Sequence, residues 1–209
     1  MEFINSVPDA PKIDISEVDR LTFETAERDY ITEGKTARLE AYTSKYPDGA
    51  YFAKATSYLL EAAVEDGDDD KAYGYATALV ERFPDNSLSE NAYAVVATRQ
   101  YNLGQTEPAL ATWRALEQRA SSSKNLNAAR TGIMRAARDL SDYEAVIAAA
   151  DALLASSTLG SEDKTEAIFS RGIALEMRGD REAARDEWRK IATVTDDLYG
   201  AKSAYYLSQ

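Results

Sequence analysis

The sequence contains no cysteine and no histidine. Without cysteine there can be no disulfide, no thiol nucleophile and no thiolate metal site. Without histidine the chain lacks the most common general base and the most common transition-metal ligand. These two absences argue against an enzyme, so we expect neither catalytic residues nor a metal or other cofactor.

Basic charge and long apolar runs are also scarce. The 209 residues carry 24 Lys and Arg against 36 Asp and Glu, which gives a formal net charge of −12. Binding nucleic acid through its phosphates needs a basic face, so we expect no nucleic-acid partner. No apolar run approaches the roughly 18 residues that could cross a membrane, so we expect no direct membrane insertion. If the protein is exported, its signal would lie upstream of this sequence.

What the sequence does contain is a regular repetition. Gly67 and Ala72 each have a counterpart 37 residues later. The same residue types recur 75 positions apart in three pairs: Gly104 and Gly179, Ala109 and Ala184, and Trp113 and Trp188. Self-similarity at a fixed period predicts one supersecondary unit of about 37 residues copied along the chain, which is typical of a solenoid.

The repetition suggests a division of the chain. Residues 1–15 contain Pro8 and Pro11 and show no helical period, so we expect an extended lead-in. Residues 16–209 form the repeat domain, with units at approximately 16–49, 50–86, 87–123, 124–160 and 161–197 and the start of a further repeat at 198–209. Because the last unit stops before any turn or polar cap, we expect a fragment of a longer repeat protein.

The first helix of the repeat domain has a recognisable start. Ser16 and Asp19 match the spacing of a capping box, in which an acid three residues after a hydroxyl residue reaches back to the helix start. Leu21, Ala26 and Tyr30 are the expected buried side of this helix.

The fourth unit departs from the pattern. Its serine-rich linker, Ser121–Ser123, is expected to lead into a first helix over 128–140. Ser141 stands where the other turns have a glycine, and Ala150 stands where the second helices of the third and fifth units have Trp113 and Trp188. Glycine in such a turn permits a left-handed backbone that ends a helix sharply. The recurring alanines are expected to let neighbouring helices cross closely, and the tryptophans are expected to fill the groove between neighbouring repeats.

The repeated residues resemble the tetratricopeptide repeat (TPR) family. Within residues 165–196, Gly172, Gly179 with Asp180, Ala184 and Trp188 fall at the family's spacing. The resemblance implies an all-α fold, a right-handed α-α superhelix of about four to five helix pairs. The long period resembles the repeats of bacterial envelope TPR proteins, and residues 24–49 resemble large TPR proteins of Bacteroidetes. This implies a periplasmic or outer-membrane-associated location.

In the TPR family the first helices of the pairs line a concave groove that receives partner segments. By that resemblance six residues are candidates for partner binding: Asn91, Thr98, Tyr101, Asn102, Arg135 and Arg138. Arg135 and Arg138 lie three residues apart, so they can share one helix face and hold a carboxylate or an acidic peptide. The alternative is that these are solvated helix positions.

Two other patterns have structural interpretations. The acidic stretch Asp66–Asp70 lacks the glycine and glutamate positions of a calcium loop, so its carboxylates are expected to cap a helix. Ser121 with Lys124, and Ser161 with Lys164, have the spacing of a serine-hydrolase motif but none of its other elements. We therefore interpret both stretches as loops between repeats.

The sequence therefore predicts a non-catalytic scaffold that binds a partner peptide or helix in the groove of the solenoid, beside further repeats of the full-length chain. The alternative is a glycan-binding envelope lipoprotein component that uses TPR helices as a frame.

Overall fold

The computed structural model of the chain describes residues 15–193 and 196–209. Within these residues all of the regular secondary structure is helical, and turns and loops connect the helices. The α-helices are α1 (Ile15–Glu33), α2 (Ala37–Lys45), α3 (Phe52–Glu65), α4 (Asp69–Arg82), α5 (Glu90–Asn102), α6 (Thr106–Arg119), α7 (Ser123–Asp139), α8 (Tyr143–Leu154), α9 (Ser161–Met177), α10 (Arg181–Arg189) and α11 (Leu198–Ser208). One 3₁₀ turn, η1 (Ser87–Ser89), precedes α5. None of the described helices is both long and apolar enough to cross a membrane.

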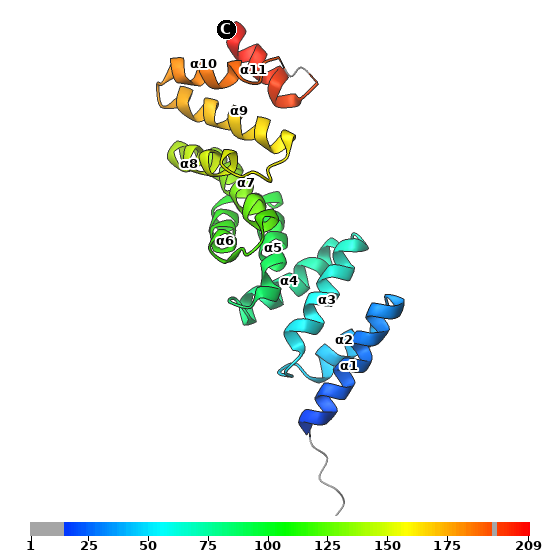
Figure 1. Cartoon of the computed structure of the whole chain (residues 1–209). Helices are drawn as coiled ribbons and strands as arrows, with labels where there is room; N and C mark the ends of the chain where they lie inside the picture. Colours follow the sequence, from blue (N-terminus) through cyan, green and yellow to red (C-terminus); the bar gives the residue numbers. More distant parts are fainter. Residues whose placement is uncertain (1–14, 194–195) are drawn as a thin grey trace, which may run out of the picture. The chain divides into compact units, whose positions relative to one another are not determined.

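The chain divides into two compact units, residues 1–75 and 76–209, with the boundary inside α4. Residues 1–14 of the expected lead-in lie outside the described part of the chain, and Ile15 already belongs to α1. Figure 1 shows the helices in chain order, with the first unit in blue to cyan.

In the first unit, α1 packs on α2 and α2 packs on α3. Phe23 and Ala26 of α1 are buried with Leu39 and Tyr42 of α2. The expectation for Leu21 was wrong, because its side chain is 49% exposed. The buried stripe of α1 instead follows residues 19, 23 and 26 at helical spacing, the half-buried Tyr30 continues it, and Leu21 lies off it.

The expected capping role of Asp19 was also wrong. Asp19 is buried, and its two oxygens accept hydrogen bonds from the Tyr42 hydroxyl at 2.6 Å and the Ala50 backbone N–H at 3.0 Å. A Cβ added at Gly49 would lie 2.6 Å from the Tyr42 hydroxyl oxygen, so only glycine fits beside this bond. The carboxylate thus joins α1 to the turn after α2, a contact between distant residues that local spacing could not show.

In the second unit, each helix from α5 to α10 packs on the next one along the chain (Figure 1). Ala109 of α6 and Ala184 of α10, the repeated alanines, are both fully buried. Small side chains at these positions allow neighbouring helices to approach closely. The expected packing role of the repeated alanines is confirmed.

The turns between paired helices repeat one geometry. Gly104 and Gly179 have φ values of +75° and +92°. After α5, the backbone N–H of Gly104 donates to Tyr101 O and that of Gln105 donates to Gln100 O, the bond pair that ends many helices. Ser141 makes the same turn with a φ of +58°, so a residue with a side chain occupies the left-handed conformation there.

Both tryptophans lie against a glycine in the first helix of a helix pair, Gly132 of α7 or Gly172 of α9. A Cβ added at Gly132 would come within 2.3 Å of the Trp113 ring, and one at Gly172 within 2.3 Å of the Trp188 ring. Trp113 therefore packs from α6 onto the following pair. Trp188 packs on its own pair and also meets Tyr206 of α11, with ring centroids 4.9 Å apart. The expected filling of the space between repeats is confirmed for both.

Helix α7 begins earlier than the sequence suggested. It starts at Ser123, five residues before the expected start, and Ser122 caps it by accepting a hydrogen bond from the Asn125 backbone N–H at 3.1 Å. Serine is a favoured N-cap because its oxygen satisfies an unpaired N–H of the first turn. The serine-rich stretch thus caps the helix as well as linking it, and the earlier start lengthens the exposed face of α7.

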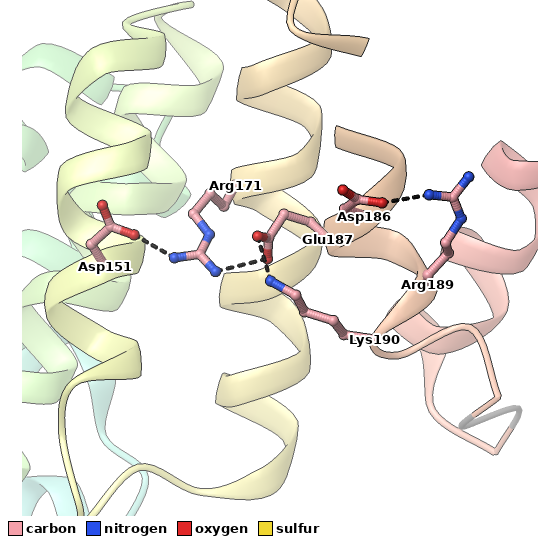
Figure 2. Close-up of polar contacts among 6 residues, drawn as sticks. All are labelled: Asp151, Arg171, Asp186, Glu187, Arg189 and Lys190. Atoms are coloured by element: carbon pink, nitrogen blue, oxygen red, sulfur yellow. Dashed lines mark hydrogen bonds and ion pairs between the residues drawn. The ribbon is translucent and has the colours of Figure 1, made fainter. Parts of the chain in front are cut away.

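Arg171 of α9 ties three helices of the second unit together (Figure 2). Its guanidinium pairs with Asp151 of α8 and with Glu187 of α10, the latter at 2.7 Å. Lys190 makes a further ion pair with Glu187 at 2.6 Å. Arg171 and Glu187 are largely buried, whereas the neighbouring Asp186–Arg189 pair in Figure 2 is exposed on both sides.

Candidate functional site

In the second unit α7 contacts both α5 and α9, the first helices of the neighbouring pairs, so the outward residues of these three helices share one face. On this face lies a hollow of about 730 Å³. Most of its lining comes from α7, with further residues from α5, α6, α9 and the turn before α9. We call it the α7 hollow. Its lining residues are Thr98, Tyr101, Asn102, Trp113, Ser123, Lys124, Asn127, Ala128, Thr131, Gly132, Arg135, Thr158 and Asp163.

Four of the six candidate residues from the sequence line this hollow: Thr98, Tyr101, Asn102 and Arg135. Asn91 does not line it, and its side-chain oxygen accepts a hydrogen bond from Asn125 Nδ2 at 3.1 Å.

Arg138 is separated from Arg135 and lines a second, smaller hollow together with residues of α9 and α11. The two arginines share α7, but they line different hollows.

Arg135 is engaged by a buried partner. Its Nε and Nη2 donate to Oε1 and Oε2 of Glu166 at 2.8 and 2.5 Å, a bidentate pair, and the Glu166 side chain is only 2% exposed. Burial by itself raises the pKa of Glu166, but the hydrogen bonds and charge of Arg135 outweigh it and bring the pKa below its ordinary value. Arg135 therefore stabilises the contact between α7 and α9.

Tyr101 is also held in place. Its hydroxyl donates a hydrogen bond to Asp139 Oδ2 at 2.5 Å. Burial, together with this bond to a carboxylate, raises the pKa of Tyr101 to about 12, so the hydroxyl is neutral at physiological pH. The ring forms a fixed wall of the α7 hollow.

Asn127 leaves one polar atom without a partner in the described part of the chain. Its Nδ2 donates to Thr158 Oγ1 at 3.2 Å, while its Oδ1 is buried and makes no hydrogen bond. A buried acceptor without a donor costs free energy. The Oδ1 atom is itself buried, so it is not exposed to the hollow that other atoms of Asn127 line.

The remaining walls of the hollow carry mostly neutral hydrogen-bonding groups. Thr98, Asn102, Thr131 and Ser123 supply hydroxyl and amide groups, which both donate and accept. Hydroxyl and amide groups suit the alternating N–H and C=O groups of a polypeptide segment.

Sequence reasoning missed the lining residues of α7 that lie before Arg135. Lys124, Ala128, Thr131 and Arg135 follow one another at spacings of four, three and four, which places them on one helix face. The signal was present in the sequence, but the expected helix began at residue 128, so the first turn of this face was assigned to a linker.

The acidic stretch at Asp66–Asp70 starts a helix, as expected. Asp68 Oδ1 accepts a hydrogen bond from the backbone N–H of Lys71 at 3.1 Å, in the first turn of α4. Among the described residues there is no group of three or more acidic side chains placed to hold a metal ion.

Comparison with known proteins shows similarity of fold alone. No protein-family model matches the sequence, and no curated protein matches it. Among solved structures, the chain is similar to the nearly identical TPR-like repeats of a Podosopora anserina protein assigned to the kinesin light chains. The TM-score is 0.50 and the identity 15%, over 88% of this chain and 97% of that one. A variant of the same repeats matches with the same values.

A TPR protein of Thermus thermophilus is 16% identical over 91% of this chain and all of its own, with a TM-score of 0.43. The likeness to the Podosopora anserina repeats, together with the paired helices, confirms the prediction of an all-α, TPR-like solenoid. The finer resemblance to envelope proteins and to those of Bacteroidetes stays a prediction.

Proposed function

We propose that this protein is a non-catalytic interaction scaffold that binds a short segment of a partner protein in the α7 hollow. The observation that carries the proposal is the hollow itself, which lies on the face formed by α5, α7 and α9. Its volume of about 730 Å³ lies within the range of roughly 300–1,000 Å³ found for ligand sites.

The chemistry of the lining favours binding over catalysis. Arg135 and Tyr101, two titratable residues of the hollow, are held by structural partners, Glu166 and Asp139. The neutral hydroxyl and amide groups of the lining offer hydrogen bonds to a peptide backbone. Trp113 and Tyr101 add aromatic surface for an apolar side chain.

The test is to fill the hollow. Peptides selected from a random displayed library on the wild-type protein would be titrated against Ala128→Trp, which places a large ring in the hollow. Ala111→Trp is the matched control, because Ala111 is an exposed residue of α6 and does not line the hollow. We expect Ala128→Trp to weaken binding at least tenfold and Ala111→Trp to leave it within twofold. Equal binding to all three proteins would contradict the proposal.

The same variants distinguish the glycan-binding alternative from peptide binding. If no peptide is selected, and oligosaccharides raise the melting temperature of the wild type but not of Ala128→Trp, the hollow is a glycan site.

For location we propose the bacterial periplasm or the outer membrane, because of the resemblance to envelope repeat proteins. Fractionation of cells that carry the tagged full-length protein tests this, and a cytoplasmic fraction would contradict it.

A further inference from the structure

The second hollow, which Arg138 lines, has a chemistry of its own. It measures about 340 Å³, and its lining comes from three successive first helices. Arg138 belongs to α7, Phe169 and Ile173 to α9, and Tyr199, Lys202 and Tyr206 to α11. We call it the aromatic hollow.

The apolar part of this hollow is a packed aromatic cluster. The Phe169 side chain is largely buried, and its ring centroid lies 5.6 Å from that of Tyr199 and 5.7 Å from that of Tyr206. Tyr206 in turn contacts Trp188 at 4.9 Å, and Trp188 is buried. The rings are therefore held by the core of the second unit, and they offer a preformed apolar surface.

Two cations border the aromatic surface without a carboxylate partner among the described residues. Lys202 Nζ lies 5.3 Å from the Tyr199 ring centroid and 5.8 Å from that of Phe169. Arg138 Nη1 donates to the Ser170 hydroxyl, a neutral acceptor, at 3.1 Å. Glu166 exerts a charge interaction on Arg138, but both of its oxygens are bound by Arg135.

Two cations that make no hydrogen bond or ion pair with a carboxylate of the described residues are notable in a chain whose net charge is −12. Charged groups left beside an apolar surface favour an occupant of opposite charge, since a carboxylate accepts strong hydrogen bonds from arginine and lysine. A cation–π contact alone accounts for the position of Lys202. It does not account for Arg138, whose guanidinium has only a hydroxyl partner.

We propose that the aromatic hollow binds an acidic peptide segment in which a carboxylate adjoins an aromatic or branched apolar side chain. The carboxylate would bridge Arg138 and Lys202, and the apolar side chain would lie on Phe169, Ile173 and Tyr206.

The two hollows are neighbours along α7. Arg135 lines the α7 hollow and Arg138 the aromatic hollow, three residues or about 4.5 Å further along the helix axis. One extended segment can therefore reach both, which favours a peptide over an isolated small anion. The choice of a peptide as the occupant rests on the proposed function, and the inference adds that this peptide is acidic and carries an apolar side chain.

The probe is a fluorescently labelled peptide of about 12 residues with Asp-Phe-Glu at its centre and Gly and Ser on either side. Two matched peptides carry Asn-Phe-Gln or Asp-Ala-Glu instead. We expect the acidic, aromatic probe to bind the wild type at least tenfold more tightly than either matched peptide. The preference for the acidic probe should fall when the salt concentration is raised.

Arg138→Gln and Lys202→Gln are each expected to weaken binding of the acidic probe about tenfold or more. Lys164→Gln is the matched control, because it removes the same charge from an exposed position of α9 that lines neither hollow. It should change the affinity less than twofold. Circular dichroism and urea unfolding would show that all three variants are folded.

Three results would overturn the inference. They are equal binding of the neutral and acidic probes, wild-type affinity in both Arg138→Gln and Lys202→Gln, and no binding of the acidic probe at millimolar concentration. If library peptides lose affinity with Ala128→Trp while the acidic probe keeps its wild-type affinity in both Arg138→Gln and Lys202→Gln, the proposed function stands and this inference fails. If the acidic probe responds to Lys202→Gln while library peptides ignore Ala128→Trp, the aromatic hollow stands and the α7 hollow fails.

Discussion

Arg135 holds both oxygens of Glu166, a carboxylate that is almost completely buried between α7 and α9. A sequence-based hypothesis placed Arg135 among the residues that contact a partner. The structure shows that its guanidinium also neutralises a buried charge of the protein itself. Any change at Arg135 is therefore expected to act on folding as well as on binding.

Arg135→Leu should lower the free energy of unfolding by about 1–3 kcal/mol, because it leaves the Glu166 charge buried without its partner. Arg138→Leu is the matched control on the same helix, and it should cost less, because the partner of Arg138 is a hydroxyl. Urea unfolding followed by circular dichroism measures both. Equal unfolding midpoints for wild type and Arg135→Leu would show that the Arg135–Glu166 pair contributes nothing to stability.

The same pair makes stability depend on pH. The pKa of Glu166 is lowered in the folded protein, so below about pH 4.5 the unfolded chain binds this proton more readily than the folded one. The stabilisation is present above that pH and is lost as the pH falls through the folded pKa. The stability difference between wild type and Glu166→Gln should therefore be larger at pH 7 than at pH 3.5. A difference that does not change over this range would contradict the assignment.

Replacing each of three helix glycines by alanine is expected to change the stability of the protein in different directions. Helix propensity alone predicts a gain of about 1 kcal/mol for each Gly→Ala change. At Gly132 and Gly172 the new Cβ would come within 2.3 Å of a tryptophan ring, so we expect a net loss of about 1–3 kcal/mol instead. Gly74 of α4 has no atom within 4 Å of such a Cβ and should show the gain. Thermal unfolding of the three variants checks this, and a gain at Gly172 would contradict the packing of Trp188.

Ser141 offers a stabilising substitution. Its φ of +58° lies in the left-handed region, where a side chain costs roughly 1 kcal/mol and glycine costs none. Ser141→Gly should raise the free energy of unfolding by up to about 1 kcal/mol. The reverse change, Gly104→Ser, at the equivalent turn, should lower it by a similar amount. If Ser141→Gly destabilised the protein in urea unfolding, the equivalence of the two turns would be wrong.

The repeat residues could be predicted from the sequence because their roles are local or periodic. Gly104 and Gly179 adopt the left-handed turns, and Ala109 and Ala184 are buried at helix crossings, as their recurrence indicated. Ser141 was recognised as an exception for the same reason. These features depend on the order of residues within one unit, which a single sequence records.

The candidate site was only partly predictable, because its contacts join separate units. Thr98 and Tyr101 were identified from the resemblance to the first helices of TPR pairs, but Glu166, which holds Arg135, lies 31 residues away. Asn127 was missed because Ser122 caps α7 earlier than the serine-rich linker suggested. In the first unit, Asp19 was assigned to a local cap but bonds to Tyr42, 23 residues later.

The most direct test of the account is to locate a bound peptide on the protein by NMR. Backbone amide signals of the ¹⁵N-labelled chain would be followed during titration with a peptide selected on the wild type. The account predicts that the largest shifts fall on Thr98, Asn127 and Thr131 of the α7 hollow, with little change at Ala111 of α6 or Ala148 of α8. Shifts concentrated on α6 and α8, with the α7 hollow unchanged, would contradict it.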